Sequence, residues 1–115
     1  MNRIKKLFTY LKENGFDVYT PGQKQGECTS SYLVIKSDGS TKTSAFSTAQ
    51  DTFTIMCYVP KNKYSTLEEY VNNVYEVMKG LKPLFKSTEE RTPSFYDDSC
   101  KAHMTSLSYI SNRKL

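Results

Sequence analysis

The residues best suited to chemistry stand near the end of the sequence. Cys100 and His103, the single histidine, are separated by two residues, and a thiol beside an imidazole is a pairing that nucleophilic catalysis uses. In an extended strand, however, positions three apart point to opposite faces. The sequence also shows no third group that would orient the imidazole. We therefore interpret His103 as a sheet-surface or interface histidine and expect no enzyme activity.

The cysteines do not have the spacing of a metal site. Cys28, Cys57 and Cys100 are far apart in the sequence, whereas zinc ligands come in close pairs. Their odd number also argues against a disulfide framework. We interpret them as reduced, mostly buried thiols that pack as small hydrophobic residues, and we predict no metal site.

Two further features have residue types that acid–base or phosphate chemistry uses. Asp97 and Asp98 are adjacent carboxylates, but neighbours in a strand diverge, so a solvated turn is the better interpretation. Gly22 and Gly26 bound a polar loop without the glycine pattern that cradles phosphate. We therefore expect no cofactor.

A mixed basic and aromatic segment follows one strong strand pattern. Lys61 and Lys63 stand beside Tyr58 and Tyr64, and such a group can stack bases and neutralise phosphates. The alternative is a solvated loop whose tyrosines cover the core, which we favour. A small nucleic-acid-binding module remains an alternative function.

Composition describes one small domain with an aromatic core. The chain has 115 residues, a net charge of +4, nine tyrosines and six phenylalanines. The basic residues are scattered, which gives no separate argument for nucleic acid. No apolar run approaches the roughly 20 residues of a membrane helix, and the first residues lack a signal peptide's apolar stretch. We expect no membrane contact and a protein that stays in the cytoplasm where it is made.

Periodicity predicts two helices and five strands. Apolar spacing indicates one helix over residues 3–14 and a second that begins at Ser65. Ser65 and Glu68 have the spacing of a capping box, and Leu67, Val71, Val74, Met78 and Leu81 form the apolar stripe. Alternation predicts strands over residues 16–20, 31–37, 41–47, 52–59 and 101–110, and Asp38-Gly39 predicts a tight turn between the second and third.

These elements define an α+β fold. We predict a single domain over residues 1–115, in which two helices pack on one face of a mainly antiparallel sheet of four to six strands. The element order is helix, four strands, helix, strand. Pro93–Asp98 is expected to be an irregular or extended lead-in to the last strand.

Three stretches resemble a known family. Tyr19–Ser40, Phe53–Val74 and Thr92–Lys114 are similar to the tail terminator, or tail completion, proteins of Gram-positive tailed phages, prophages and phage-tail-like bacteriocins. The most specific parts are the loop P-G-Q-K-x-G-E-C-T-S, the segment Y-V-P-x-x-x-Y-S-x-L-E and the segment S-F-Y-D-D-x-x-K-A-H-M. The resemblance covers most of the chain and includes no catalytic signature.

The resemblance implies a structural virion protein. Such a subunit forms a hexameric ring that caps the completed tail tube, stops tube polymerisation and offers a docking surface to the head connector or the sheath. Its partners would be other copies of itself, the tube protein and the sheath or connector, with at most transient contact with passing DNA. It would be made in the host cytoplasm and end in the tail or neck of the particle, and it could be a monomer before assembly.

Polar loops between well-patterned elements are the candidate assembly contacts. They contain Gln23, Lys24, Gln25, Lys61, Asn62 and Lys63. Another neck component, such as a head-completion or connector protein, remains the nearest alternative to a terminator. The sequence leaves open whether the tail is contractile or flexible, and whether a head exists.

Overall fold

The computed structural model describes residues 3–23, 26–42 and 48–114. Its helices are α1 (Arg3–Glu13) and α2 (Leu67–Met78), with 3-10 turns η1 (Lys61–Thr66) and η2 (Lys79–Leu81) on either side of α2. Its strands are β1 (Val18–Tyr19), β2 (Tyr32–Lys42), β3 (Thr48–Pro60), β4 (Lys86–Arg91), β5 (Phe95–Asp97) and β6 (Ala102–Lys114). The predicted α+β class is confirmed.

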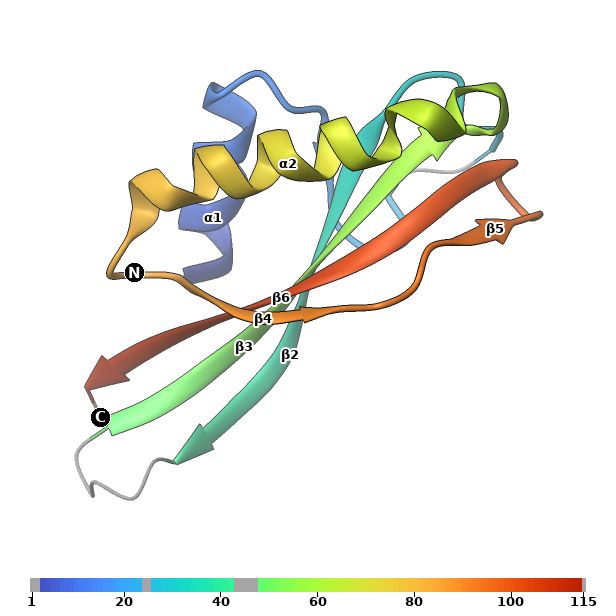
Figure 1. Ribbon diagram of the computed structural model, residues 1–115. Coiled ribbons are helices and arrows are strands. Elements are labelled where there is room, and N and C mark those ends of the chain that lie inside the picture. Colours follow the sequence, from blue (N-terminus) through green and yellow to red (C-terminus); the bar gives the residue numbers. More distant parts are fainter. Residues whose placement is uncertain (1–2, 24–25, 43–47, 115) are drawn as a thin grey trace.

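One sheet of six strands carries both helices. Its strand order is β1-β2-β3-β6-β4, and β5 also pairs with β6. All pairs are antiparallel except β1 with β2, which is parallel. Both helices lie on the same face of the sheet (Figure 1). The predicted arrangement is therefore correct, and β4 is a strand that periodicity did not predict.

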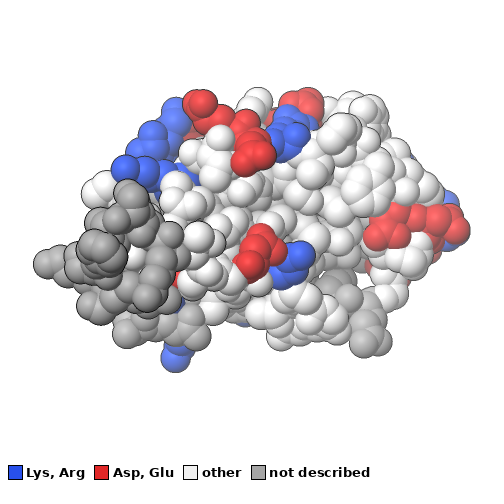
Figure 2. Space-filling view, turned by 90° about the horizontal axis from the view of Figure 1, so that it is seen from below, with Lys and Arg blue, Asp and Glu red and all other residues white. Residues whose placement is uncertain are grey.

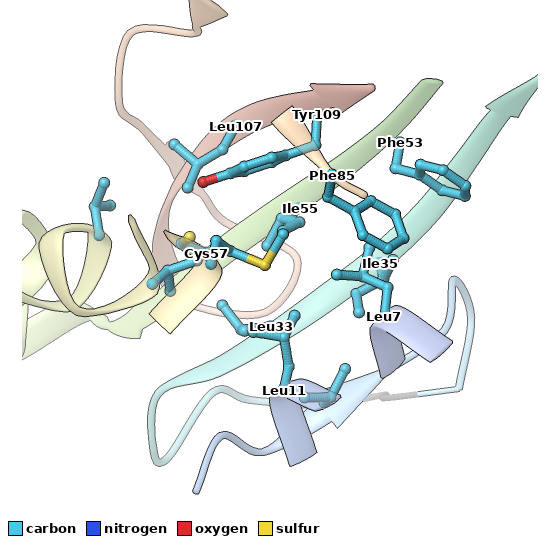
Figure 3. Close-up of a cluster of buried hydrophobic side chains, with 14 of the residues drawn as sticks. Leu7, Leu11, Leu33, Ile35, Phe53, Ile55, Cys57, Phe85, Leu107 and Tyr109 are labelled. Atoms are coloured by element: carbon cyan, nitrogen blue, oxygen red, sulfur yellow. The ribbon is translucent and has the colours of Figure 1, made fainter. Parts of the chain in front are cut away.

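The main core lies between the helices and the central strands. As predicted, Phe53, Ile55, Cys57 and Val59 alternate inward along β3, and all four are buried. Figure 3 shows the α1 side chains Leu7 and Leu11 reaching the β2 residues of this core. The predicted stripe of α2 is buried against the same cluster: Leu67, Val71, Val74, Met78 and, in η2, Leu81. Burying one such side chain contributes about 1.5–3 kcal/mol, so this layer fixes both helices on the sheet.

A smaller cluster covers part of the opposite face. It contains the buried residues Cys28, Tyr32, Val34 and Ala102. The Tyr32 ring stacks on Tyr58, with centroids 4.8 Å apart. The Cys28 N–H donates to the Cys100 carbonyl at 2.6 Å, which ties the segment before β2 to the turn before β6. Tyrosine side chains thus pack on both faces of the sheet.

The predicted tight turn at Asp38-Gly39 is wrong. β2 continues through both residues to Lys42, and the chain connection to β3 lies within residues 43–47, outside the described residues. Ser37 pairs with Phe53 and Gly39 with Thr52, so Asp38 is the extra residue of a β-bulge. Gly39 has φ 103°, a conformation that glycine adopts without a steric cost. The predicted strand over residues 41–47 falls partly on the end of β2 and partly on residues outside the described chain.

The predicted capping box is also wrong. α2 begins at Leu67, after η1, and its N-cap residue makes no side-chain capping bond. The Glu68 carboxylate instead accepts two hydrogen bonds from Arg91 of β4, at 2.6 and 3.0 Å. Arg91 Nε also donates to the Thr105 hydroxyl of β6 at 3.2 Å. Glu68 therefore joins α2 to the sheet and does not cap the helix.

Neither helix that the structure describes is long and apolar enough to cross a membrane.

Candidate assembly interface

The structure places four of the six predicted contact residues. Gln23 is exposed in a turn, where its side-chain oxygen accepts from the Thr20 backbone N–H at 2.9 Å. Lys24 and Gln25 lie outside the described residues. Lys61, Asn62 and Lys63 are exposed, as predicted, but they form the 3-10 turn η1 and not an irregular loop.

The two predicted loops do not form one site within the described residues. The bonds of the Gln23 side chain remain in its own turn. The segment 29–31 lies beside η1 instead, and together with α2 it lines a hollow of about 480 Å³ that includes Lys63 and Tyr70. Gln23 does not line this hollow.

An exposed group of aromatic side chains adjoins η1. We name it the aromatic patch and define it as Tyr64, Tyr96 and His103. Phe95 pairs with Met104, so its side chain lies on the other face of β5. Tyr64, Phe95 and Tyr96 are 55%, 49% and 42% exposed, and they are the exposed large hydrophobic residues of the described chain. Single exposed hydrophobic residues are ordinary on a protein surface, whereas a contiguous group is typical of an interaction site.

His103 holds the aromatic patch together. Its ring lies 4.6 Å from the Tyr64 ring and 5.2 Å from the Tyr96 ring, centroid to centroid. Its Nε2 lies 3.2 Å from the Lys61 carbonyl oxygen, which can only accept, so Nε2 is the protonated nitrogen when this bond forms. η1, β5 and β6 therefore meet at this histidine. The interpretation of His103 as a surface histidine agrees with its position.

Sequence reasoning missed Phe95 and Tyr96 as surface residues. Both lie in β5, where Phe95 pairs with Met104 and Tyr96 with His103. The sequence does contain one signal for an exposed site: an aromatic pair stands directly before two acidic residues in a segment predicted to be extended. Its exposure follows from β5 being short and from its pairing with β6 alone, which only the tertiary structure shows.

The predicted basic and aromatic group for nucleic acid is not assembled. Tyr58 pairs with Met104 in the sheet and packs on Tyr32, on the face opposite the helices. Tyr64 packs on His103. His103 is next to Met104 in β6, so its side chain lies on the opposite face of the sheet from Tyr58. Lys61 and Lys63 thus share a surface with Tyr64 but not with Tyr58.

The cysteines and the histidine form no nucleophile–base pair. Cys28, Cys57 and Cys100 are free thiols, and the first two are buried. Burial, and then the nearby Asp97 carboxylate, raise the pKa of the Cys100 thiol, which lowers its thiolate fraction at neutral pH. Burial raises the pKa of Cys57 to about 12. Within the described ranges no three His, Cys, Asp or Glu side chains are grouped so that they could hold a metal ion.

A second surface feature lies at the other end of α2. It is a hollow of about 320 Å³ between the end of α2, β4 and β6, and we name it the tyrosine hollow. Its lining consists of Tyr75, Met78, Lys79, Lys82, Ser87, Glu89 and Tyr109. Burial, and then the neighbouring Tyr75 phenol, raise the pKa of Tyr109, so this hydroxyl keeps its proton.

The hydroxyls of Tyr75 and Tyr109 are available to a ligand. Neither has a hydrogen-bond partner among the residues that the structure describes. Lys82 stands at the hollow without an ion pair to the described residues, whereas Lys79 binds Glu76 at 2.9 Å. An apolar lining with a few convergent polar groups is typical of a binding site.

No family model matches the chain, and no curated protein matches it.

Proposed function

We propose that this chain is a structural subunit of a phage tail or tail-like particle, which forms a ring on the completed tail tube and stops its polymerisation. The resemblance of Tyr19–Ser40, Phe53–Val74 and Thr92–Lys114 to tail terminator proteins supports the proposal. Its partners are other copies of the chain, the tube protein and a sheath or head-connector protein. Its place is the tail or neck of the particle, after synthesis in the host cytoplasm.

The observation that carries the proposal is the aromatic patch beside η1. A ring subunit needs interfaces and no catalytic group. Tyrosine and phenylalanine are enriched at protein–protein interfaces, and truncation of an interface tyrosine is often costly to binding. Here exposed aromatic residues stand next to Lys61, Asn62 and Lys63, which the sequence independently marks as contact residues.

The shape of the molecule suits a subunit with several neighbours. Its principal extents are 48 × 25 × 24 Å. The ends of β2, β3 and β6 project beyond both helices (Figure 1), so the sheet offers surface away from the main core. Contacts at more than one part of a subunit are what a ring on a tube end requires.

Electron microscopy of particles from a strain that lacks this reading frame tests the proposal. Tails of abnormal length, unjoined beside filled heads or free in headless particles, are the expected result. Tails of normal length with heads that leak DNA or fail to attach would assign the chain to the connector side of the neck. Particles identical to wild type would refute the virion function.

A matched pair of complementing variants connects the phenotype to the patch. Tyr64→Ser with Tyr96→Ser should fail to restore tail length, because it removes two exposed rings. Lys5→Ser with Lys12→Ser, which changes two exposed side chains of α1, should restore it. Equal rescue by both variants would count against the aromatic patch as the assembly surface.

A further inference from the structure

Two surface features with complementary chemistry lie at opposite ends of α2. η1, with the aromatic patch, directly precedes the first residue of the helix, and Met78 of the tyrosine hollow is its last residue. The twelve residues of α2 span about 18 Å at 1.5 Å per residue. The two features therefore cannot meet within one chain.

The first feature includes Tyr96 of the aromatic patch. It is β5 with the residue that follows, which we name the β5 tip and define as Phe95, Tyr96, Asp97 and Asp98. Phe95 is half exposed, and it makes no ring contact with the described residues, whereas Tyr96 packs on His103. Asp98 is 83% exposed, and its ion pair with Lys101 at 3.2 Å is a surface pair, which binds weakly in water. The β5 tip thus offers a free phenyl ring followed by an accessible carboxylate.

β5 also offers backbone acceptors. It pairs with β6 on one side and has no strand neighbour on its other side among the described elements. An unpaired strand edge presents backbone carbonyl groups that can accept hydrogen bonds from another chain. The β5 tip is therefore apolar, acidic and able to accept hydrogen bonds over a few neighbouring residues.

The tyrosine hollow offers the opposite set of groups. Its apolar lining comes from Tyr75, Met78 and Tyr109. The two phenol hydroxyls have no hydrogen-bond partner, and Lys82 has no ion pair, among the residues that the structure describes. Lys86 lies at an adjoining hollow that shares Lys82, Ser87 and the carboxylate Glu89, so the two hollows together hold more cations than carboxylates. A phenyl ring, carbonyl acceptors and a carboxylate are the partners that these groups require.

The charges follow the same arrangement. Figure 2 shows acidic side chains gathered at one end of this face, and basic side chains with some acidic ones beside them toward the other end. The β5 tip carries Asp97 and Asp98, whereas the hollows at the other end of α2 are lined by Lys79, Lys82 and Lys86 and by one carboxylate, Glu89. Opposite charges at the two ends favour head-to-tail contact between copies and disfavour contact between like ends.

We propose that the β5 tip of one copy docks into the tyrosine hollow of the next copy. Phe95 enters the apolar lining, the carbonyl groups of β5 accept from the hydroxyls of Tyr75 and Tyr109, and Asp98 pairs with Lys82. Because the two surfaces differ, the contact is heterologous, and its repetition closes a ring when the rotation between copies divides a full turn. This inference rests on the proposed function, since a ring subunit must bind its own copies.

Two variants with one damaged surface each test this contact. Phe95→Asp damages the β5 tip and leaves the tyrosine hollow intact. Lys79→Glu with Lys82→Glu repels Asp98 and leaves the β5 tip intact. Lys5→Glu with Lys12→Glu makes the same change of charge on α1, none of whose residues lines the tyrosine hollow or belongs to the β5 tip, and is the matched control. Circular dichroism and thermal unfolding verify that all three variants are folded.

Sedimentation velocity over a concentration series up to millimolar protein gives the readout. Wild type and the α1 control should gain mass with concentration, and each damaged variant alone should associate at least tenfold more weakly. An equimolar mixture of the two damaged variants has one intact contact, so it should form dimers and nothing larger. A wild type that remains monomeric throughout, or damaged variants that associate like wild type, would overturn the proposed contact.

The particle phenotype separates this inference from the proposed function. Monomeric wild-type protein together with abnormal tails in the deletion strain would refute the contact and retain the function. Association through the two surfaces together with wild-type particles would retain the contact and refute the function.

Discussion

The Tyr10 hydroxyl of α1 occupies the space where residue 80 would place a β-carbon, and residue 80 is a glycine. The same hydroxyl donates to the Val77 carbonyl near the end of α2 at 2.7 Å. One hydrogen bond thus links the two helices, and it depends on the missing side chain at Gly80.

Gly80→Ala should destabilise the protein through this contact. The new methyl group overlaps the Tyr10 hydroxyl and displaces it from the Val77 carbonyl, at an expected cost of about 1–2 kcal/mol in the free energy of unfolding. Urea denaturation measures it. In a Tyr10→Phe background the nearest ring carbon lies 3.5 Å from the added carbon, which is ordinary contact. Gly80→Ala should cost little there, and an equal cost in both backgrounds would contradict this explanation.

The bond between Glu68 and Arg91 should make stability depend on pH in the acid range. Hydrogen bonding to Arg91 lowers the pKa of Glu68 below its ordinary value of 4.5. A carboxyl with a lowered folded-state pKa stabilises the fold at pH values above its unfolded pKa, and this contribution is lost as the pH falls through the folded-state pKa. The stabilising contribution is therefore fully present at pH 7 and is lost progressively as the pH falls below the ordinary pKa of 4.5.

Glu68→Gln isolates this effect. It should lower the free energy of unfolding at pH 7 by about 0.5–1 kcal/mol, the range of an exposed ion pair with good geometry. Denaturant titrations should show a larger difference from wild type at pH 7 than at pH 3. Glu69→Gln, which alters an exposed carboxylate beside it, is the control, and a similar pH dependence in both variants would exclude the Arg91 bond as the cause.

Substitutions of Tyr58 and Tyr64 should distinguish an effect on folding from an effect on assembly. Tyr58 is half buried against Tyr32, so Tyr58→Ala should cost about 3 kcal/mol of stability. Tyr64 is exposed, so Tyr64→Ala should change stability by less than about 1 kcal/mol and impair particle assembly. Thermal unfolding and complementation measure the two effects. A Tyr64 variant that unfolds as readily as the Tyr58 variant would assign Tyr64 a structural role.

The three thiols should differ in reactivity. Cys57 is buried with a pKa of about 12, and Cys28 is also buried, so neither should react with an aromatic disulfide reagent in the native protein. Cys100 is partly exposed and should react, though slowly, because its pKa is raised. Unfolding in guanidinium should make all three thiols accessible to the reagent. Rapid native labelling of Cys57 would show that the main core opens readily.

Periodicity predicted the elements whose side chains face a core. Phe53, Ile55 and Val59 alternate inward as expected, and the stripe of α2 is buried. Local dipeptide signals were less reliable, because Asp-Gly suits a bulge inside a strand as well as a turn between strands. Ser65 and Glu68 show the same limit: a capping pattern does not form when Arg91, distant in sequence, takes the carboxylate.

The candidate interface was predictable only in part. Lys61, Asn62 and Lys63 could be identified as exposed from their polarity between two patterned elements. The rings of Phe95 and Tyr96 could not, because an aromatic pair usually indicates burial. Their exposure depends on the pairing of three residues of β5 with β6 and on the absence of a strand beyond it in the described sheet.

The position of β6 affects the protein while it is being synthesised. β6 follows every other strand in the sequence, yet it pairs with β3 along thirteen residue pairs and also holds β4 and β5. Until the ribosome has released it, the nascent chain exposes one whole edge of β3 with the alternating apolar side chains of Phe53, Ile55 and Val59. Such an edge can pair with another chain, so synthesis interrupted before Ala102 would yield an aggregating product and not a smaller folded one.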